Sequence, residues 1–211
     1  MKLDQYFDRI YLINLKRRSD RLEKFFQGIA PHVTTTWSIE VVEAVDGPAV
    51  RPDLGYEAGK WGCAMSHKRV HELIMESNDQ KVLILEDDCE FFDDFEEKFA
   101  SALEDLPNTW DMFYLGGNLW VPPVKYKNSI HKIVKCYATH AYAVTRDFVK
   151  NYHHLIDFNS IIDNQYAELH SMMNAYVIHP SICGQFTSYS DVENKEVDYT
   201  NVFKKYGRFS S

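Results

Sequence analysis

The sequence predicts a single α/β domain with a mostly parallel central sheet and flanking helices. Short apolar runs alternate with helical patterns along the chain, and no internal repeat or linker interrupts them. The clearest strand, Val82 to Leu85, contains no polar residue, as a strand covered on both faces requires. A chain of 211 residues is also of a size that forms one domain with one substantial core.

The first half of the chain has the pattern of alternating strands and helices. Residues 10–15 are rich in β-forming side chains, and Ser19 then caps a helix whose apolar positions recur at helical spacing. A second strand is predicted over residues 39–45, followed by a polar loop as far as Trp61. A helix then follows over about residues 63–77.

The second half continues the alternation. The predicted elements are a helix over residues 95–103 capped by Asp94 and Glu97, a strand over 111–115, one or two strands within 130–144, a helix capped by Thr145, a helix beginning at Ser160 and a strand over 176–178. The remaining residues show little periodicity, and we expect them to wrap the outside of the domain.

Three consecutive acids, Glu86, Asp87 and Asp88, follow the apolar strand directly. Ligands of α/β proteins bind at the carboxyl ends of such strands. Carboxylates this close repel one another, so the cluster needs full solvation or a hard divalent cation that bridges it to phosphate oxygens. The second option indicates a nucleotide-diphosphate site. The alternative is that the acids only cap the next helix, but Asp93 and Asp94 already occupy that position.

The charge balance bears on the class of partner. A net charge of −8 disfavours a nucleic-acid partner, because proteins normally bind nucleic acids through a basic face. One local basic cluster, formed by Lys16, Arg17, Arg18 and Arg21, is of a size that suits a phosphate group.

No apolar run has the length of a signal peptide or a membrane span, so we expect a soluble, cytoplasmic chain, with peripheral membrane association left open. The cysteines are scattered without a CxxC pair, which indicates free thiols rather than a zinc site or disulfides. They are Cys63, Cys89, Cys136 and Cys183.

Seven motifs occur in a fixed order between about residues 10 and 165, and we expect the carboxyl-terminal quarter to agree poorly with the same pattern. They are Tyr11 to Arg21 (YLINLKRRSDR), Ala44 to Gly47 (AVDG), Gly62 to His67 (GCAMSH), Leu83 to Asp88 (LILEDD), Trp110-Asp111 with Tyr114 to Gly116, Thr139 to Tyr142 (THAY) and Ile161 to Asp163 (IID). On these motifs the chain resembles the glycosyltransferase family 25 group, which includes lipooligosaccharide and collagen galactosyltransferases.

This resemblance implies a GT-A fold, in which a Rossmann-like sheet binds a nucleotide sugar. The nucleotide-binding part would span about residues 8–120 and the acceptor part about residues 121–211. The implied reaction is an inverting transfer of a hexose, galactose or glucose, from a UDP-sugar to a hydroxyl of a glycan, a lipooligosaccharide or a hydroxylysine. A homodimer is left open.

The resemblance also suggests a role for each acid. The triplet corresponds to the DxD motif of metal-dependent GT-A enzymes, with Glu86 in the first place and Asp88 in the third. Asp88 would bind Mn²⁺ or Mg²⁺ directly, because it lies farthest from the strand, while Glu86 and Asp87 would hold the ribose or a metal-bound water. His140 or His179 could complete the metal shell.

The first strand and helix supply further candidates for donor binding. Asn14 ends the strand, and Arg18 and Arg21 lie at the start of the helix, a combination suited to an anionic group or to an acid of the core. The alternative is a solvated basic helix start. Asp46 could accept hydrogen bonds from uridine or ribose, or it could simply form the turn before Gly47.

Ser66 and His67 face inward near the start of their helix, so their polar atoms need partners. We expect them to support the acidic triplet, with Ser66 on the donor side.

An inverting transfer needs one base opposite the departing diphosphate. Asp163 is the candidate, because the family places an acceptor-side acid late in the chain, and Asp191 is the alternate. Asp163 also has capping-box spacing from Ser160, which is the competing role.

The sequence offers four aromatic side chains as stacking faces for sugar rings, although aromatic residues of this kind are more often part of a core. They are Trp61, Trp110, Trp120 and Tyr142. Trp120, which lies between a glycine pair and two prolines, is the strongest candidate for an acceptor groove.

Two other functions fit the same acids. A GT-A scaffold without catalysis would bind a nucleotide sugar or glycan, and a two-metal phosphoesterase would also be rich in acids.

Overall fold

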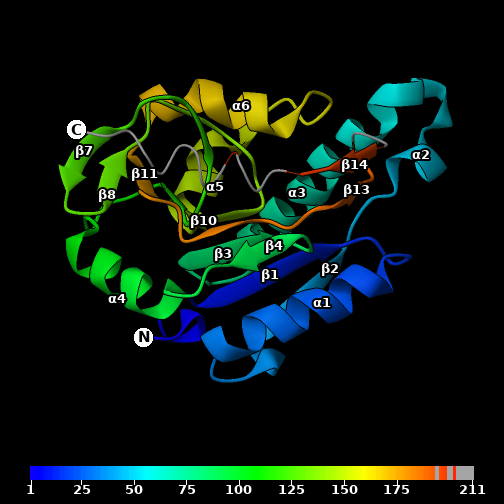
Figure 1. Cartoon of the computed structure of the whole chain (residues 1–211). Coiled ribbons are helices and arrows are strands. Elements are labelled where there is room, and N and C mark those ends of the chain that lie inside the picture. The colour runs from blue at the N-terminus through cyan, green and yellow to red at the C-terminus, as the bar shows by residue number, and fades with distance from the viewer. Residues whose placement is uncertain (193–194, 199–201, 203–211) are drawn as a thin grey trace.

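The computed structural model describes residues 1–192, 195–198 and 202, and its main feature is an eight-stranded sheet (Figure 1). The strands of this sheet are β1 (Arg9–Asn14), β2 (Ile39–Glu43), β3 (Lys81–Glu86), β5 (Met112–Tyr114), β7 (Val124–Lys127), β8 (Ile130–Lys132), β10 (Ala141–Thr145) and β11 (Ala175–Ile178). Their order across the sheet is β2-β1-β3-β10-β5-β11-β8-β7.

Most of the strands run in one direction. Strand β1 is parallel to β2 and β3, and β5 is parallel to β11. Strand β10 is antiparallel to both of its neighbours, and so is β8. Six strands of the eight therefore point one way and two the other, which confirms the predicted mostly parallel α/β fold. The carboxyl ends of β1, β2 and β3 meet at one edge.

Helices cover both faces of the sheet (Figure 1). They are α1 (Ser19–Ile29), α2 (Gly47–Val50), α3 (Ala58–Glu76), α4 (Phe95–Asp105), α5 (Arg146–Tyr152) and α6 (Ile162–Leu169). Helices α1 and α4 pack on one face, and α3, α5 and α6 pack on the other. Among the described residues, no helix combines the length and the apolar character that a membrane crossing needs.

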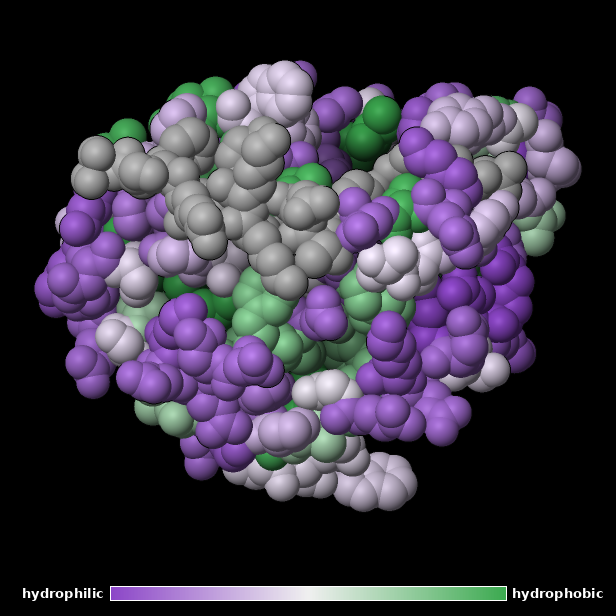
Figure 2. Space-filling view, viewed as in Figure 1, coloured by the Kyte–Doolittle hydropathy of each residue, from purple (hydrophilic) through white to green (hydrophobic). Residues whose placement is uncertain are grey.

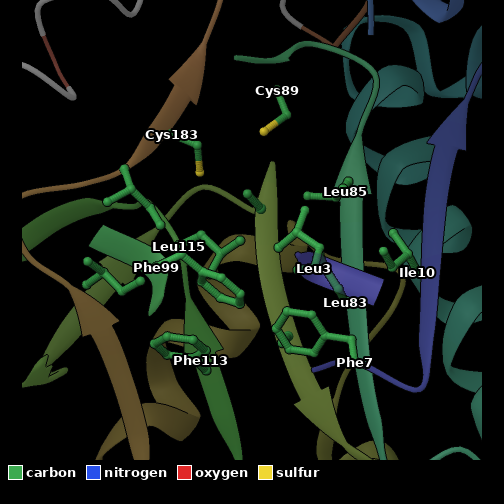
Figure 3. Packing of buried hydrophobic residues seen from close by; sticks show 14 of the residues in the cluster. Leu3, Phe7, Ile10, Leu83, Leu85, Cys89, Phe99, Phe113, Leu115 and Cys183 are labelled. Carbon is green, nitrogen blue, oxygen red and sulfur yellow. The ribbon is translucent and has the colours of Figure 1, made fainter. Parts of the chain in front are cut away.

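The two faces explain the unbroken apolar run of β3. Leu83 and Leu85 point to the α1 and α4 side, while Val82 and Ile84 point to the opposite side. Figure 3 shows the first of these layers, with Leu83 among aromatic side chains that include Phe99. Because both faces are covered, every one of these four positions must be apolar. The outer surface is by contrast mostly hydrophilic in the view of Figure 2.

Three small antiparallel sheets complete the fold of the described residues. They pair β4 (Cys89–Phe91) with β12 (Cys183–Gln185), β6 (Asn118–Val121) with β9 (Lys135–Tyr137), and β13 (Ser188–Ser190) with β14 (Lys195–Val197). The β4 and β12 pair corrects our expectation for the tail, because Cys183 is fully buried and does not lie on the outside. This pairing returns the late part of the chain to the acidic end of β3.

Several local predictions are wrong. The stretch before Trp61 is not a loop, since it contains α2, a short 3-10 helix at Pro52–Glu57 and the start of α3. The region 130–144 holds three strands instead of one or two. Asp94 precedes α4 but makes no side-chain cap, because its carboxylate pairs with Lys98.

The start of α6 also differs from the prediction, since the helix begins at Ile162 without a side-chain cap from Ser160. The Thr145 cap of α5 is confirmed, as its hydroxyl accepts from the backbone N–H of Phe148 at 3.1 Å.

Substitutions at two glycines test the packing near the acidic edge of the sheet. A Cβ on Gly47 would lie 1.8 Å from the carbonyl oxygen of Ala58, whereas a Cβ on Gly28, in α1, would meet nothing within 4 Å. We expect Gly47→Ala to lower the free energy of unfolding by about 1–3 kcal/mol through this clash. Gly28→Ala should instead raise it by about 0.5–1 kcal/mol. Urea denaturation measures the free energy of unfolding of both variants. An unchanged value in Gly47→Ala would contradict this packing.

Candidate functional site

A cavity of about 410 Å³ opens at the carboxyl edge of β1, β2 and β3. Its wall gathers residues that are far apart in the sequence. Its polar and charged side chains include Arg17, Arg21, Asp46, Lys60, Ser66, His67, Glu86, Asp87, Asp88, Asn118, Thr139, Asp163, Gln185 and Asp191. Ten of these fourteen were singled out from the sequence: Arg17, Arg21, Asp46, Ser66, His67, Glu86, Asp87, Asp88, Asp163 and Asp191.

Asp87 is the buried centre of the acidic triplet. One carboxylate oxygen accepts from the Asn14 side-chain amide at 2.7 Å, and the other accepts from the Arg21 guanidinium at 2.7 Å. Asn14 ends β1, and Arg21 lies in the first turn of α1. Both oxygens of Asp87 are therefore engaged within the protein. Of the two roles left open for Asn14 and Arg21, the structure shows the contact with an acid of the core.

Asp88 is more weakly held than Asp87. It accepts from Arg21 and from the Gln185 amide, each at 3.2 Å. Burial raises the pKa of Asp87 to about 7 against the attraction of Arg21. Burial, with the nearby Glu86 carboxylate, also raises the pKa of Asp88. Both acids are thus more easily protonated than an exposed aspartate.

Glu86 ends β3 and accepts two hydrogen bonds. The Thr139 hydroxyl donates to it at 2.6 Å, and His67 Nε2 lies 3.3 Å from the same oxygen. Burial opposes ionisation of Glu86, but the contacts with His67 and Thr139 outweigh burial and lower its pKa. Glu86 is therefore a carboxylate.

Asp163 lies in the first turn of α6 and faces the same cavity. Its carboxylate accepts from the backbone N–H of Ala138 at 2.9 Å and lies 3.5 Å from the Thr139 hydroxyl. Burial raises its pKa. A buried carboxylate with a raised pKa is the kind of group that can take a proton from a hydroxyl.

Asp191 has a different environment. Its two oxygens accept from Arg17 at 2.7 Å and from Arg18 at 2.6 Å. Arg17 also donates to Asp46 at 2.7 Å. Two cations occupy the lone pairs that a base would need, which disfavours Asp191 as the alternate base.

Arg18 does not line the cavity, since Asp20 and Asp191 hold its guanidinium. Its neighbour Arg17, which belongs to the same predicted basic cluster, lines the cavity instead.

Ser66 and His67 are fully buried on α3, as predicted. The Ser66 hydroxyl accepts from the backbone N–H of Val45 at 2.8 Å and donates to the Gly62 carbonyl at 2.7 Å. It therefore ties α3 to the end of β2. His67 contacts Glu86, which matches its expected support of the triplet.

The structure does not bring the two candidate histidines into the cavity wall. His179 packs against His131, with ring centroids 5.0 Å apart. His140 is fully buried behind the acids. Burial favours its neutral form, but Cys183, Asp88 and Glu86 raise its pKa.

Among the described residues, one group that combines a cysteine, a histidine and an acid could hold a metal ion. Its ligand atoms, from Cys63, His67 and Glu86, lie within 4.8 Å of one another. Burial raises the pKa of the Cys63 thiol well above its usual value, so the thiolate form is disfavoured. All four cysteines of the chain are free in the structure.

The four aromatic side chains that were candidates for stacking on a sugar ring differ in their position relative to the cavity. Trp110 and Tyr142 are buried in the core and present no face to a sugar, and Trp61 packs with Arg51 instead of lining the cavity. Trp120 is 69% exposed and meets the edge of Tyr137, which lines the cavity.

Several residues of the wall were not predicted from the sequence. Thr139 belongs to one of the quoted motifs, so a signal for it was present. Lys60 and Gln185 had no such signal, because only the tertiary fold brings them to this edge.

An acid-rich cavity at the carboxyl edge of a mostly parallel sheet defines the class of α/β proteins that bind a ligand at this position. The family model for glycosyltransferase family 25 (LPS biosynthesis protein) matches residues 56–201, and the chain belongs to this family. The match includes the segment after residue 165, where we expected poor agreement. The motifs before residue 56 lie outside it.

Two relatives illustrate the range of the family. Procollagen galactosyltransferase 2 of Mus musculus is 30% identical over 132 residues, which cover 52% of this chain and 21% of that protein. Inactive glycosyltransferase 25 family member 3 of Homo sapiens is 32% identical over 136 residues, covering 52% and 22%. The matched region is thus about a fifth of the length of these relatives.

Among solved structures, the chain is similar to mannose-1-phosphate geranyltransferase from Thermus thermophilus, with a TM-score of 0.47 and 11% identity. The similarity covers 81% of this chain and 72% of that one.

Removal of Arg21 tests the buried ion pair. We expect Arg21→Ala to lower the free energy of unfolding by about 3 kcal/mol at pH 8, because Asp87 stays buried without its cation. Loss of Arg21 raises the pKa of Asp87 further. The loss of unfolding free energy is therefore largest at a pH where Asp87 is ionised, and it becomes smaller as the pH falls and Asp87 binds a proton. Urea denaturation at pH 5 and pH 8 measures both effects.

Arg9→Ala is the control, because Arg9 makes only partly exposed pairs with Glu40 and Asp79 and should cost about 1 kcal/mol or less. Equal effects of the two substitutions would contradict the assignment of Asp87.

Proposed function

We propose that this chain carries a metal-dependent inverting glycosyltransferase activity that moves a hexose from a UDP-sugar to an acceptor hydroxyl. The observation that carries the proposal is the convergence of two sets of acids on one cavity. Glu86 and Asp88 lie at the end of β3, and Asp163 faces them from α6. Leaving-group stabilisation and proton removal need acids on both sides of the reacting carbon.

The donor side of the cavity suits a nucleotide diphosphate. Its volume falls within the range of about 300–1,000 Å³ that is typical of small-molecule sites. Arg17, Arg21 and Lys60 line it and offer positive charge to the phosphates. Asp46 is placed to accept from the ribose or the base.

The acidic cluster fits a hard cation. Asp88 would bind Mn²⁺ or Mg²⁺ directly, because the lone pairs of Asp87 are committed to Asn14 and Arg21, and Glu86 would act through a bound water. The Cys63 group is less suited to such a cation, since hard cations prefer oxygen ligands. When bound, the cation would stabilise the charge that develops on the departing diphosphate.

Asp163 is the proposed base. It takes the proton of the acceptor hydroxyl while the acceptor oxygen forms a bond to the anomeric carbon and the bond from that carbon to the diphosphate breaks. UDP leaves with the electron pair. The N–H of Ala138 fixes the carboxylate in position for this transfer.

The acceptor side lies along β6 and β9. Tyr137 and Asn118, a register pair of these strands, line the cavity, and the exposed Trp120 extends from them. An exposed indole beside a cavity suits the face of a sugar ring. We propose a glycan, lipooligosaccharide or hydroxylysine acceptor and galactose or glucose as the donor sugar.

An inactive nucleotide-sugar-binding scaffold is the second candidate, since one similar family member is described as inactive. This chain carries carboxylates at every position that the proposed reaction uses, which favours the active form.

The metal assignment predicts a change in melting temperature. UDP with Mn²⁺, each at about 100 times its dissociation constant, should raise Tm by about 5 °C or more. Asp88→Asn should remove most of this increase and abolish transfer, whereas Asp94→Asn, on an exposed acid of the same region, should leave both unchanged. A full increase in Asp88→Asn would place the cation elsewhere.

The base assignment predicts a pH dependence. Because burial raises the pKa of Asp163, kcat should fall as pH decreases through that raised value, at a higher pH than an exposed aspartate would give. Asp163→Asn should lower kcat by about 100- to 10,000-fold and leave UDP binding intact. Asp191→Asn is the matched control, and a larger loss in it than in Asp163→Asn would reverse the two roles.

A further inference from the structure

A line of hydrogen-bonded polar side chains crosses the core behind the cavity. Its members, in order from the surface to the cavity, are His153, His71, Tyr166, Tyr142, His67 and Glu86. The five successive contacts between ring nitrogens, phenol oxygens and the carboxylate measure 3.3, 2.9, 3.1, 2.8 and 3.3 Å. We call this set the core chain.

The four central members of the core chain have no exposed surface, and His153 is half-buried. They lie within the apolar layer between the sheet and α3, α5 and α6, where Phe148 and Phe158 pack against His71. Polar atoms in such a layer are tolerated only when each has a partner, and the core chain supplies one for each phenol and ring nitrogen that it joins.

With His67 in its neutral form, a count of protons gives the core chain one direction. The Glu86 carboxylate can only accept, so His67 must carry a proton on Nε2. In neutral His67, Nδ1 then accepts from the Tyr142 hydroxyl.

The same logic continues outward from Tyr142. Its oxygen accepts from Tyr166, the Tyr166 oxygen accepts from Nε2–H of His71, and Nδ1 of His71 accepts from Nδ1–H of His153. Each contact then holds one proton and no member except Glu86 is charged.

The ionisation properties of the members agree with this pattern. Burial raises the pKa of Tyr142 and Tyr166, which keeps both phenols protonated. Burial lowers the pKa of His71 well below its usual value, which keeps that ring neutral. The reverse tautomer of neutral His67 would direct a bare Nε2 at a carboxylate, and two acceptors facing each other cannot form a hydrogen bond.

We propose that Tyr142, Tyr166 and His71 are positioning residues that act together with Glu86 to fix His67 in the tautomer with its proton on Nε2, and so hold the Glu86 carboxylate in one orientation at the cavity. Glu86 is thereby held from two sides, by His67 and by Thr139. The effect on sugar transfer rests on the proposed function, whereas the tautomer of His67 does not.

The test compares Tyr142→Phe and Tyr166→Phe with Tyr114→Phe. Tyr114 is an equally buried tyrosine of the same layer that stacks on Tyr142, and its hydroxyl pairs with His170 at 3.1 Å, outside the core chain. Each substitution keeps the ring and removes one buried hydroxyl, so a general loss of stability affects the control as well.

The direct measurement is a ¹H–¹⁵N correlation spectrum of protein labelled on its nine histidines, with the His67 signals assigned by His67→Gln. In the unsubstituted protein, His67 should show a protonated Nε2 and an unprotonated, hydrogen-bonded Nδ1. Tyr142→Phe should shift the His67 nitrogen signals toward a mixture of tautomers, and Tyr166→Phe should do so to a smaller extent. Tyr114→Phe should leave them in place.

The kinetic expectation is a fall in kcat/KM of about 10-fold for Tyr142→Phe, a size typical of residues that orient a ligand-binding side chain. Tyr114→Phe should stay within about twofold, as expected for a change that leaves the site intact.

A proton on Nδ1 of His67 in the unsubstituted protein, or equal effects of Tyr142→Phe and Tyr114→Phe, would overturn the proposal. The spectrum needs neither donor nor turnover. An inactive protein with the expected tautomer would therefore contradict the proposed function alone, and an active protein with the other tautomer would contradict the core chain alone.

Discussion

The candidate site depends on the burial of Asp87 between Asn14 and Arg21. This one carboxylate joins the end of β1, the first turn of α1 and the segment after β3. A buried acid is stable only when its oxygens are paired, so the three segments must meet at this point. As a result, Glu86 and Asp88, on either side of Asp87, are held at the cavity wall although they repel each other. The basic start of α1 thus serves the acidic cluster before it can serve a ligand.

The same constraint explains how much of the site the sequence could predict. The apolar run of β3 and the acids after it are local signals, and they predicted both the sheet and the edge that carries the cavity. Arg21 was also predictable as a partner for an acid, because helix starts near strand ends meet the carboxyl edge of a parallel sheet. These features follow from residues that are neighbours in the sequence.

Other features depend on the tertiary fold and had no local signal. Gln185 reaches Asp88 only because β12 pairs with β4, and Asp191 meets Arg17 only after that return. Tyr142 looked like a sugar-stacking residue, but β10 is covered on both faces, so its ring is part of the core. Asp94 failed as a cap because a lysine one helical turn away offers its carboxylate a charged partner. Competition of this kind among several partners is decided by geometry that a sequence pattern does not contain.

Membership of glycosyltransferase family 25 gives the cavity a chemical context, and the arrangement of acids supports the mechanism that we propose. In the proposed mechanism, Asp87 holds the cluster, Asp88 would bind the cation, and Asp163 faces both from the other wall. The order of these three acids around one ligand is its central claim.

An anomalous difference map of crystals grown with Mn²⁺ and UDP tests that claim most directly. We expect a manganese peak between Asp88 and the UDP phosphates, with the side chain of Asp87 still bound to Asn14 and Arg21. A peak at Cys63 and His67, or UDP bound outside this cavity, would contradict it.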